Sequence, residues 1–150
     1  MKTEQRKWTS GSGWETTSDN QLGSNANLVL VFGGRNVLSN PALFEEAKAF
    51  YPNAKILSGS TSGEILDVEV NDETISLTAI WFEHTTLKST QLKIADYANS
   101  HDAGKELGTK LAGDGLVHVF VLSDGLKVNG SELVKGFNDC LPSNISVTGG

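Results

Sequence analysis

One short segment constrains the fold of this chain more than any other. From Leu28 to Phe32 the sequence is apolar without interruption, and it is bounded by Asn27 on one side and by Gly33-Gly34 on the other. An apolar run of this length, closed by turn-forming residues, is typical of a strand that is buried on both faces. Such strands occur mainly in parallel sheets. The run therefore predicts the first strand of an α/β core.

A helix and a second strand are predicted directly after this run. Asn40 is a good N-cap, and Pro41 suits the first helical position. Apolar residues then recur at helical spacing, namely at Leu43, Phe44, Ala47 and Phe50. Ala54–Leu57 is a second short strand. Together these segments predict a β-α-β unit with two neighbouring parallel strands.

The rest of the chain predicts antiparallel hairpins and then renewed alternation of helix and strand. Residues that favour strands fill Ile65–Val70, Thr74–Glu83 and Thr86–Ala95. Further helices are expected from Ser100 to Ala112 and from Ser131 onward, and further strands at Val117–Leu122 and Ile145–Thr148. The expected fold is α/β, with a mixed sheet that has a parallel βαβ core plus antiparallel hairpins.

Residues 1–26 and 27–150 have different compositions. The first segment is polar and aperiodic, which predicts a flexible N-terminal segment, although Trp8 and Trp14 could dock on the folded body. Residues 27–150 are expected to form one domain. Its last predicted strand is followed only by Gly149-Gly150, so we expect the domain to be incomplete at its C-terminal end and to belong to a longer protein.

Composition excludes several classes of function. With 150 residues and 38% hydrophobic residues, the chain has apolar material for one core but not two. The net charge is −6 and the 12 basic residues are scattered, which argues against nucleic-acid binding. No run is long enough for a membrane helix or a signal peptide. Cys140 is the only cysteine, which excludes a disulfide framework and favours the cytoplasm.

Three loops follow predicted strands of the core and are candidates for a binding site. They are Gly33–Asn36, Ser58–Glu64 and Ser123–Ser131. Open α/β sheets bind ligands at the carboxyl edge of their strands, so these loops are expected to converge there. The candidate ligand-binding residues in them are Gly34, Arg35, Ser60, Thr61, Ser62, Glu64, Asp124, Asn129 and Ser131.

The chemistry of the first two loops favours binding over catalysis. Gly59–Gly63 has the outline of a G-x-S-x-G nucleophile motif, but Thr61 stands at its centre and a strand is expected after it, where the motif requires a helix. Its hydroxyl and amide groups could hold a polar ligand, with Glu64 facing an ammonium group. The alternative is a turn whose side chains satisfy local backbone. Arg35 could bind a carboxylate or could be an exposed arginine without a partner.

The third loop and the histidines leave similar alternatives. Asp124 could bind an ammonium group or cap its own turn, and the backbone amides at Asn129 and Ser131 would favour an anion. His84, His101 and His118 lack the spacing of metal ligands. No combination of nucleophile and base is apparent, so an enzyme is the least favoured class.

The chain resembles the N-terminal domain of the FIST family of bacterial sensory proteins. Four stretches carry the resemblance: Leu28–Gly33, Ser58–Ile65, Val119–Leu126 continuing through Asn129–Leu133, and Val147–Gly150. Many members carry Gly-Cys where this chain has Ser58-Gly59, so a role for that cysteine does not transfer.

The resemblance implies an intracellular, non-catalytic sensory domain, usually followed by a FIST C-terminal domain. The implied ligand is a small molecule such as an amino acid, and the implied output is a signal to a partner protein. One alternative is a haem-based nitric oxide sensor that regulates a histidine kinase or a cyclic-di-GMP enzyme; haem would need an axial ligand such as histidine. Another alternative is a protein–protein interaction module without a ligand.

Overall fold

The computed structural model describes residues 1–150, which form two compact units, Met1–Leu87 and Lys88–Gly150. Each unit has its own cluster of buried hydrophobic residues. The expectation of a single core is therefore wrong. The expectation from composition fails because the second core is small: its buried members are Ala103, Val119, Leu133, Phe137 and Leu141, half as many as in the first.

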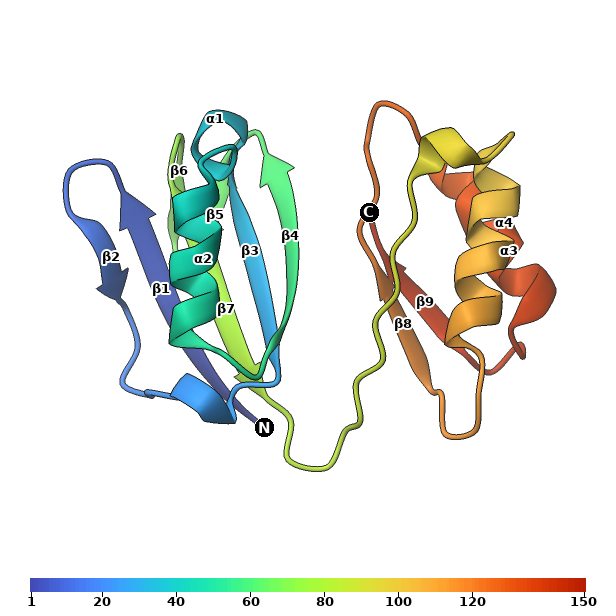
Figure 1. Ribbon diagram of the computed structural model, residues 1–150, viewed down its shortest axis with the longest axis horizontal. Helices are drawn as coiled ribbons and strands as arrows, with labels where there is room; N and C mark the ends of the chain where they lie inside the picture. The colour runs from blue at the N-terminus through green and yellow to red at the C-terminus, as the bar shows by residue number, and fades with distance from the viewer. The chain divides into compact units, whose positions relative to one another are not determined.

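The first unit is a five-stranded mixed sheet with a helix on one face (Figure 1). The strand order is β2-β1-β7-β3-β4. The strands are β1 (Lys2–Thr9), β2 (Gly13–Thr16), β3 (Leu28–Gly34), β4 (Lys55–Thr61) and β7 (Ile75–Trp81). Only β3 and β4 are parallel, and the other neighbours are antiparallel. This arrangement confirms the predicted mixed α/β fold with a parallel βαβ core.

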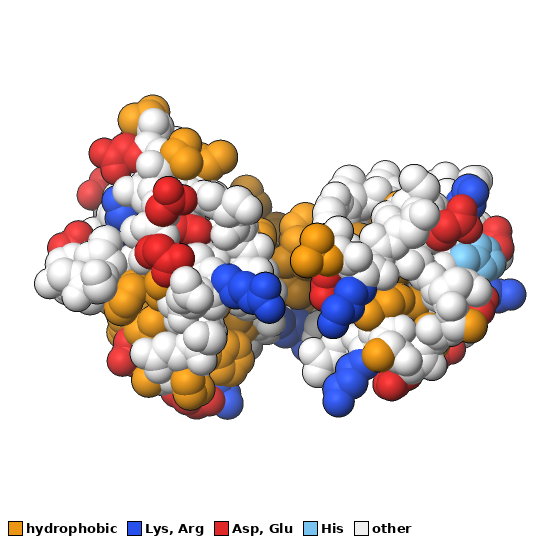
Figure 2. All heavy atoms as spheres, turned by 90° about the horizontal axis from the view of Figure 1, so that it is seen from above, with side chains coloured by type: hydrophobic (Ala, Val, Ile, Leu, Met, Phe, Trp, Pro, Cys, Tyr) orange, Lys and Arg blue, Asp and Glu red, His pale blue; other side chains and the backbone are white.

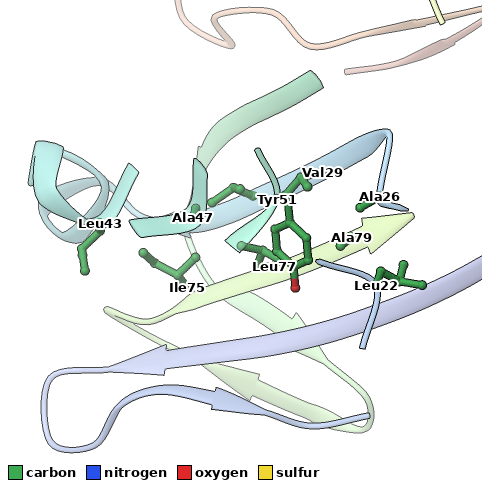
Figure 3. Packing of buried hydrophobic residues seen from close by; sticks show 10 residues of the cluster. Leu22, Ala26, Val29, Leu43, Ala47, Tyr51, Ile75, Leu77 and Ala79 are labelled. Atoms are coloured by element: carbon green, nitrogen blue, oxygen red, sulfur yellow. The ribbon is translucent and has the colours of Figure 1, made fainter. Parts of the chain in front are cut away.

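Helix α2 (Pro41–Phe50) makes the crossover between β3 and β4, after the short helix α1 (Arg35–Leu38). Asn40 caps α2 as predicted, because its side chain accepts a hydrogen bond from the Ala42 amide. Leu43 and Ala47 face the sheet and are buried. The close view of this core shows the Tyr51 ring inserted among Leu22, Val29 and Leu77 (Figure 3). In β3 only Val29 and Val31 are buried among the apolar run, since the helix covers one face of the sheet.

The N-terminal segment differs from the expected irregular lead-in. Strand β1 lies inside the sheet, pairing with β7 from Lys2 to Trp8 and with β2 from Arg6 to Thr9. The sequence does not indicate this strand, because two of the residues that face the core, Glu4 and Arg6, are charged. They form a hydrogen-bonded ion pair. Trp8 and Trp14 do dock, since both pack against the hydrophobic cluster of this unit.

The predicted strand Ile65–Val70 is itself a hairpin. It comprises β5 (Glu64–Leu66) and β6 (Glu69–Asn71), joined by a two-residue loop. Asp67 adopts a φ of 54° in that loop, which reverses the chain in the middle of a run of strand-forming residues. The predicted strand Thr86–Ala95 is also wrong. Its apolar Leu92 and Ile94 pack against the core of the second unit and no neighbouring strand pairs with them.

The second unit places two helices on one side of a two-stranded parallel sheet (Figure 1). Its elements are α3 (Ser100–Leu111), β8 (His118–Val121), α4 (Gly130–Cys140) and β9 (Ser146–Gly149). The N-caps are Asn99 and Asn129, one and two residues before the predicted Ser100 and Ser131. None of the helices in either unit combines the length and apolar character needed to cross a membrane.

Candidate functional site

The parallel pairing of β3 and β4 brings two of the three predicted loops together within the first unit. In the strand register Gly33 lies opposite Ser60, and Gly34 lies opposite Thr61. Arg35 follows Gly34 at the start of α1, and Ser62 follows Thr61. The carboxyl edge of this parallel pair therefore holds six candidate residues: Gly34, Arg35, Ser60, Thr61, Ser62 and Glu64.

Glu64 is almost fully enclosed, with 2% of its surface exposed. Its Oε1 atom accepts a hydrogen bond from Thr61 Oγ1 at 2.8 Å. Its Oε2 atom accepts from the Thr74 amide at 3.1 Å and from Thr74 Oγ1 at 2.9 Å. The Glu64 carboxylate thus links the turn after Thr61 to Thr74, the residue before β7, by hydrogen bonds. This network holds the Thr61 hydroxyl in a fixed position.

Gly33 and Gly34 fit closely against the same region. A Cβ atom on Gly33 would lie 2.8 Å from the Thr74 carbonyl oxygen, and one on Gly34 would lie 3.0 Å from Glu73 Cα. The Gly34 amide donates to the Thr74 carbonyl oxygen at 3.1 Å. Both glycines therefore allow a backbone approach that a side chain would block. The motif Gly59–Gly63 leads into strand β5, as predicted, and not into the helix that a nucleophile elbow needs.

The remaining three candidate residues lie in the second unit, in the loop between β8 and α4. Asp124 Oδ1 accepts hydrogen bonds from the amides of Leu126 at 2.9 Å and Lys127 at 3.2 Å. Asn129 caps α4 by accepting from the Glu132 amide, and its own amide donates to Ser100 Oγ. Ser131 is exposed in the first turn of α4. Each unit thus presents its own group of candidate residues, and their convergence on one ligand stays a prediction.

A cavity of about 180 Å³ opens within the second unit at the carboxyl end of β8. Its walls are mainly apolar and come from α3, α4, β8 and the segment before α3; among them are Leu92, Ile94, Ala103, Leu107, Val128 and Leu133. Ser123 and Asp124 add polar groups to the lining. The cavity is therefore apolar inside and has the Asp124 carboxylate in its wall, within the predicted loop Ser123–Ser131.

Sequence reasoning identified Asp124 but missed the apolar walls of this cavity. Leu92 and Ile94 were assigned to a strand, and their alternation was the only available signal that they turn toward a core. Leu107 and Leu133 lie on the apolar faces of α3 and α4. No pattern in the sequence indicates that the side chains on these faces leave a cavity at the end of β8.

Each of the three histidines has a polar neighbour within its own unit. His101 Nε2 lies 2.8 Å from Asp139 Oδ2, and this contact, followed by the contact with Asp102, raises the pKa of His101. His118 Nε2 lies 2.9 Å from Thr148 Oγ1. His84 is exposed beside Glu83. No histidine lines the cavity at the end of β8 or the shallower one near Tyr97, and no three potential ligands cluster for a metal ion.

Acidic and basic residues both contribute to the surface, with 18 acidic and 12 basic residues in the chain. Figure 2 shows acidic and basic side chains interspersed over the face that it displays. In a comparison with known protein families, the model of the FIST N domain matches residues 27–150. No curated protein and no solved structure matches the chain.

Proposed function

Because the chain belongs to the FIST N domain family, a family of sensory domains, we propose that it binds a small ligand without transforming it and signals to a partner protein. The proposed ligand is amino-acid-like, with a compact apolar group and an ammonium group. The proposed partner is a downstream signalling protein, such as the histidine kinase or cyclic-di-GMP enzyme that the resemblance implies.

The observation that supports this proposal most directly is the cavity at the end of β8. Its volume of about 180 Å³ suits a compact apolar group, since an engineered apolar cavity of about 150 Å³ admits benzene. Leu107, Val121 and Leu133 would contact that group. Asp124 accepts from the Leu126 and Lys127 amides and lies 4.0 Å from the Lys127 ammonium nitrogen, so its carboxylate already has a cation beside it, and an ammonium group of the ligand would be attracted to the same charge.

The candidate residues of the first unit have a different part in the proposal. Arg35, Ser60 and Ser62 are exposed at one strand edge and offer donors for a carboxylate or hydroxyl group. The hydrogen bond between Thr61 and Glu64 stabilises the conformation of the turn at that edge. The absence of a helix after Gly63 supports binding in place of hydrolysis.

Calorimetric titration of the full chain with isopentylamine, L-leucine and isovalerate tests the ligand class. We expect the two amines to bind and isovalerate, which lacks the ammonium group, to bind more weakly. Asp124→Asn keeps a side-chain oxygen for the turn but removes the charge, so it should weaken amine binding by roughly 1.5–3 kcal/mol with the fold intact. Leu107→Phe should also weaken binding by filling the cavity.

Two results would contradict the proposal. One is that none of the three compounds binds. The other is that Asp124→Asn and Leu107→Phe both bind the amines as the unaltered chain does. Asp124→Ala, which also removes the acceptor from the turn, should lower the melting temperature where Asp124→Asn does not.

A further inference from the structure

The β5–β6 hairpin of the first unit has apolar side chains on its outer face. In its register Ile65 lies opposite Val70, and Leu66 lies opposite Glu69. Glu64 and Leu66 are buried, so the alternation of a strand turns Ile65 and Val70 outward. Ile65 is 71% exposed and Val70 is 74% exposed. Val68, in the loop between the strands, is 90% exposed.

This arrangement departs from the usual pattern of a hairpin with one buried face, because its outer face is apolar as well. Antiparallel strands that pack on a core from one side normally carry polar residues on the other side. Here three branched apolar side chains within six residues remain in water. Single exposed apolar residues are common, but a contiguous group on one element marks an interaction surface. Folding of the unit therefore leaves most of the surface of these three side chains in water.

Acidic residues surround this apolar group. The stretch from Asp67 to Glu73 contains four carboxylates and no basic residue. Lys7 reaches Glu69 at 3.4 Å and Asn71 at 2.8 Å, whereas Asp67 and Asp72 form no ion pair. At the upper left of Figure 2, where the hairpin lies, hydrophobic and acidic side chains stand beside one another. The hairpin surface is thus apolar and negatively charged at the same time.

We propose that the outer face of the β5–β6 hairpin docks a basic amphipathic segment of a partner protein. Apolar side chains of that segment would cover Ile65, Val68 and Val70, while its Lys or Arg residues would face Asp67 and Asp72. Charge complementarity selects this occupant, since an anionic membrane would be repelled by the same carboxylates. The proposal adds a surface to the proposed signalling role and rests on that role only for the existence of a partner.

Fluorescence anisotropy with two labelled peptides tests this inference on the full chain. One peptide alternates Lys with Leu, and the other alternates Glu with Leu, so that apolar content is matched. We expect the basic peptide to bind and the acidic one not to bind. Val68→Ser with Val70→Ser should weaken binding at least tenfold, because both side chains are exposed and their loss leaves the fold intact.

Two further variants separate the contributions of charge and general hydrophobicity. Asp67→Asn with Asp72→Asn should weaken binding and reduce its dependence on salt. Asn suits the φ of 54° at position 67, so the loop keeps its shape. Leu126→Ser is the matched control, because Leu126 is 94% exposed but lies in the second unit. It should bind the basic peptide as the unaltered chain does.

Several results would overturn the inference. Equal binding of both peptides, or unchanged binding by the serine double variant, would remove the hairpin from the interaction. Self-association in sedimentation equilibrium that the same variant abolishes would make a second copy the occupant. Binding to phosphatidylserine vesicles through the hairpin would make it a membrane contact. Ligand titration is a separate measurement, so failure of the ligand proposal leaves these readouts unaffected.

Discussion

Two carboxylates of the first unit, those of Glu4 and Glu64, lie in its interior and are satisfied by hydrogen bonds. Glu4 accepts from the Leu22 amide at 2.6 Å and from Arg6 Nε at 2.8 Å. Arg6 in turn lies over the Phe50 ring, 4.2 Å from its centroid, and within 2.9 Å of the Tyr51 hydroxyl oxygen. This network fixes the N-terminal strand to the end of α2.

The pKa directions of this network follow from burial and hydrogen bonding. Burial by itself raises the pKa of Glu4, but hydrogen bonds from Leu22, Tyr51 and Arg6 and the charge of Arg6 lower it below its ordinary value of 4.5. Burial, followed by the hydrogen bond to Glu4, raises the pKa of Tyr51. Glu4 therefore stays charged and Tyr51 stays neutral at physiological pH.

Glu4→Gln should destabilise the first unit by about 2–3 kcal/mol, because it removes the charge from a buried, hydrogen-bonded pair. Since folding lowers the pKa of Glu4, its contribution is present above pH 4.5 and is lost as the pH falls toward its lowered value. Urea unfolding at pH 7 and at pH 3 should thus show a smaller difference between the variant and the unaltered chain at pH 3.

Tryptophan fluorescence is the measurement for this variant, because Trp8, Trp14 and Trp81 all belong to the first unit. Glu45→Gln is the control, since Glu45 is exposed on α2 and should change stability little. An equal effect of the two substitutions would show that the buried network does not contribute as described.

At the scale of elements, close packing of α3 against α4 defines the second unit. Gly104 of α3 and Gly136 of α4 allow the two backbones to approach directly. A Cβ atom on Gly104 would collide with the Leu133 carbonyl oxygen, and one on Gly136 would collide with the His101 carbonyl oxygen. Small residues at such crossings replace side-chain contact with backbone contact. The helix backbones therefore approach closely at these two glycines, while Phe137 and Leu141 pack beside Gly108 further along α3.

Gly136→Ala should destabilise the second unit by about 1–3 kcal/mol, because the added methyl group has no space, and this outweighs the better helix propensity of alanine. Gly130→Ala is the matched change in the same helix, where a Cβ atom would meet nothing within 4 Å. Thermal unfolding followed by far-ultraviolet circular dichroism should show a lower midpoint for the first variant only. A midpoint for Gly136→Ala at or above that of Gly130→Ala would contradict the close packing.

At the scale of the whole chain, the segment between the two units lacks regular structure from Glu83 to Lys93. It leaves β7 of the first unit and enters the second at Lys88, where Leu92 and Ile94 begin to contribute to the hydrophobic cluster. Lys88 and Lys93 are exposed in this segment. Backbone without helix or sheet hydrogen bonds opens most easily to proteases.

Limited digestion of the full chain with trypsin should therefore cut first after Lys88 or Lys93. Mass spectrometry would then find two large fragments corresponding to the two units before cuts appear after Lys105, Lys110 or Lys135, which lie in helices. First cuts within β1, after Lys2, Arg6 or Lys7, would instead restore the flexible N-terminal segment that its composition predicted.

Several elements were predictable because their signals are local. The apolar run of β3, the Asn40-Pro41 start of α2 and the parallel partner β4 follow from hydrogen bonding and side-chain chemistry within a few residues. The apolar periodicity of α3 and α4 likewise located both helices to within two residues at their starts. The FIST resemblance had the same local basis, and the family match over residues 27–150 confirms it.

The remaining features depend on contacts between segments far apart in the chain. Strand β1 pairs with β7 and β2, and its charged residues are accommodated because Glu4 accepts from the Leu22 amide and Arg6 contacts the Tyr51 hydroxyl; composition does not reveal these partners. The cavity at the end of β8 depends on the packing of Leu92, Leu107 and Leu133, which come from three separate segments and leave a space between them. The sequence alone therefore determined the elements whose stability is local. Only the tertiary structure decided where polar groups could be buried and where apolar ones were left exposed, because those outcomes depend on which partners packing supplies.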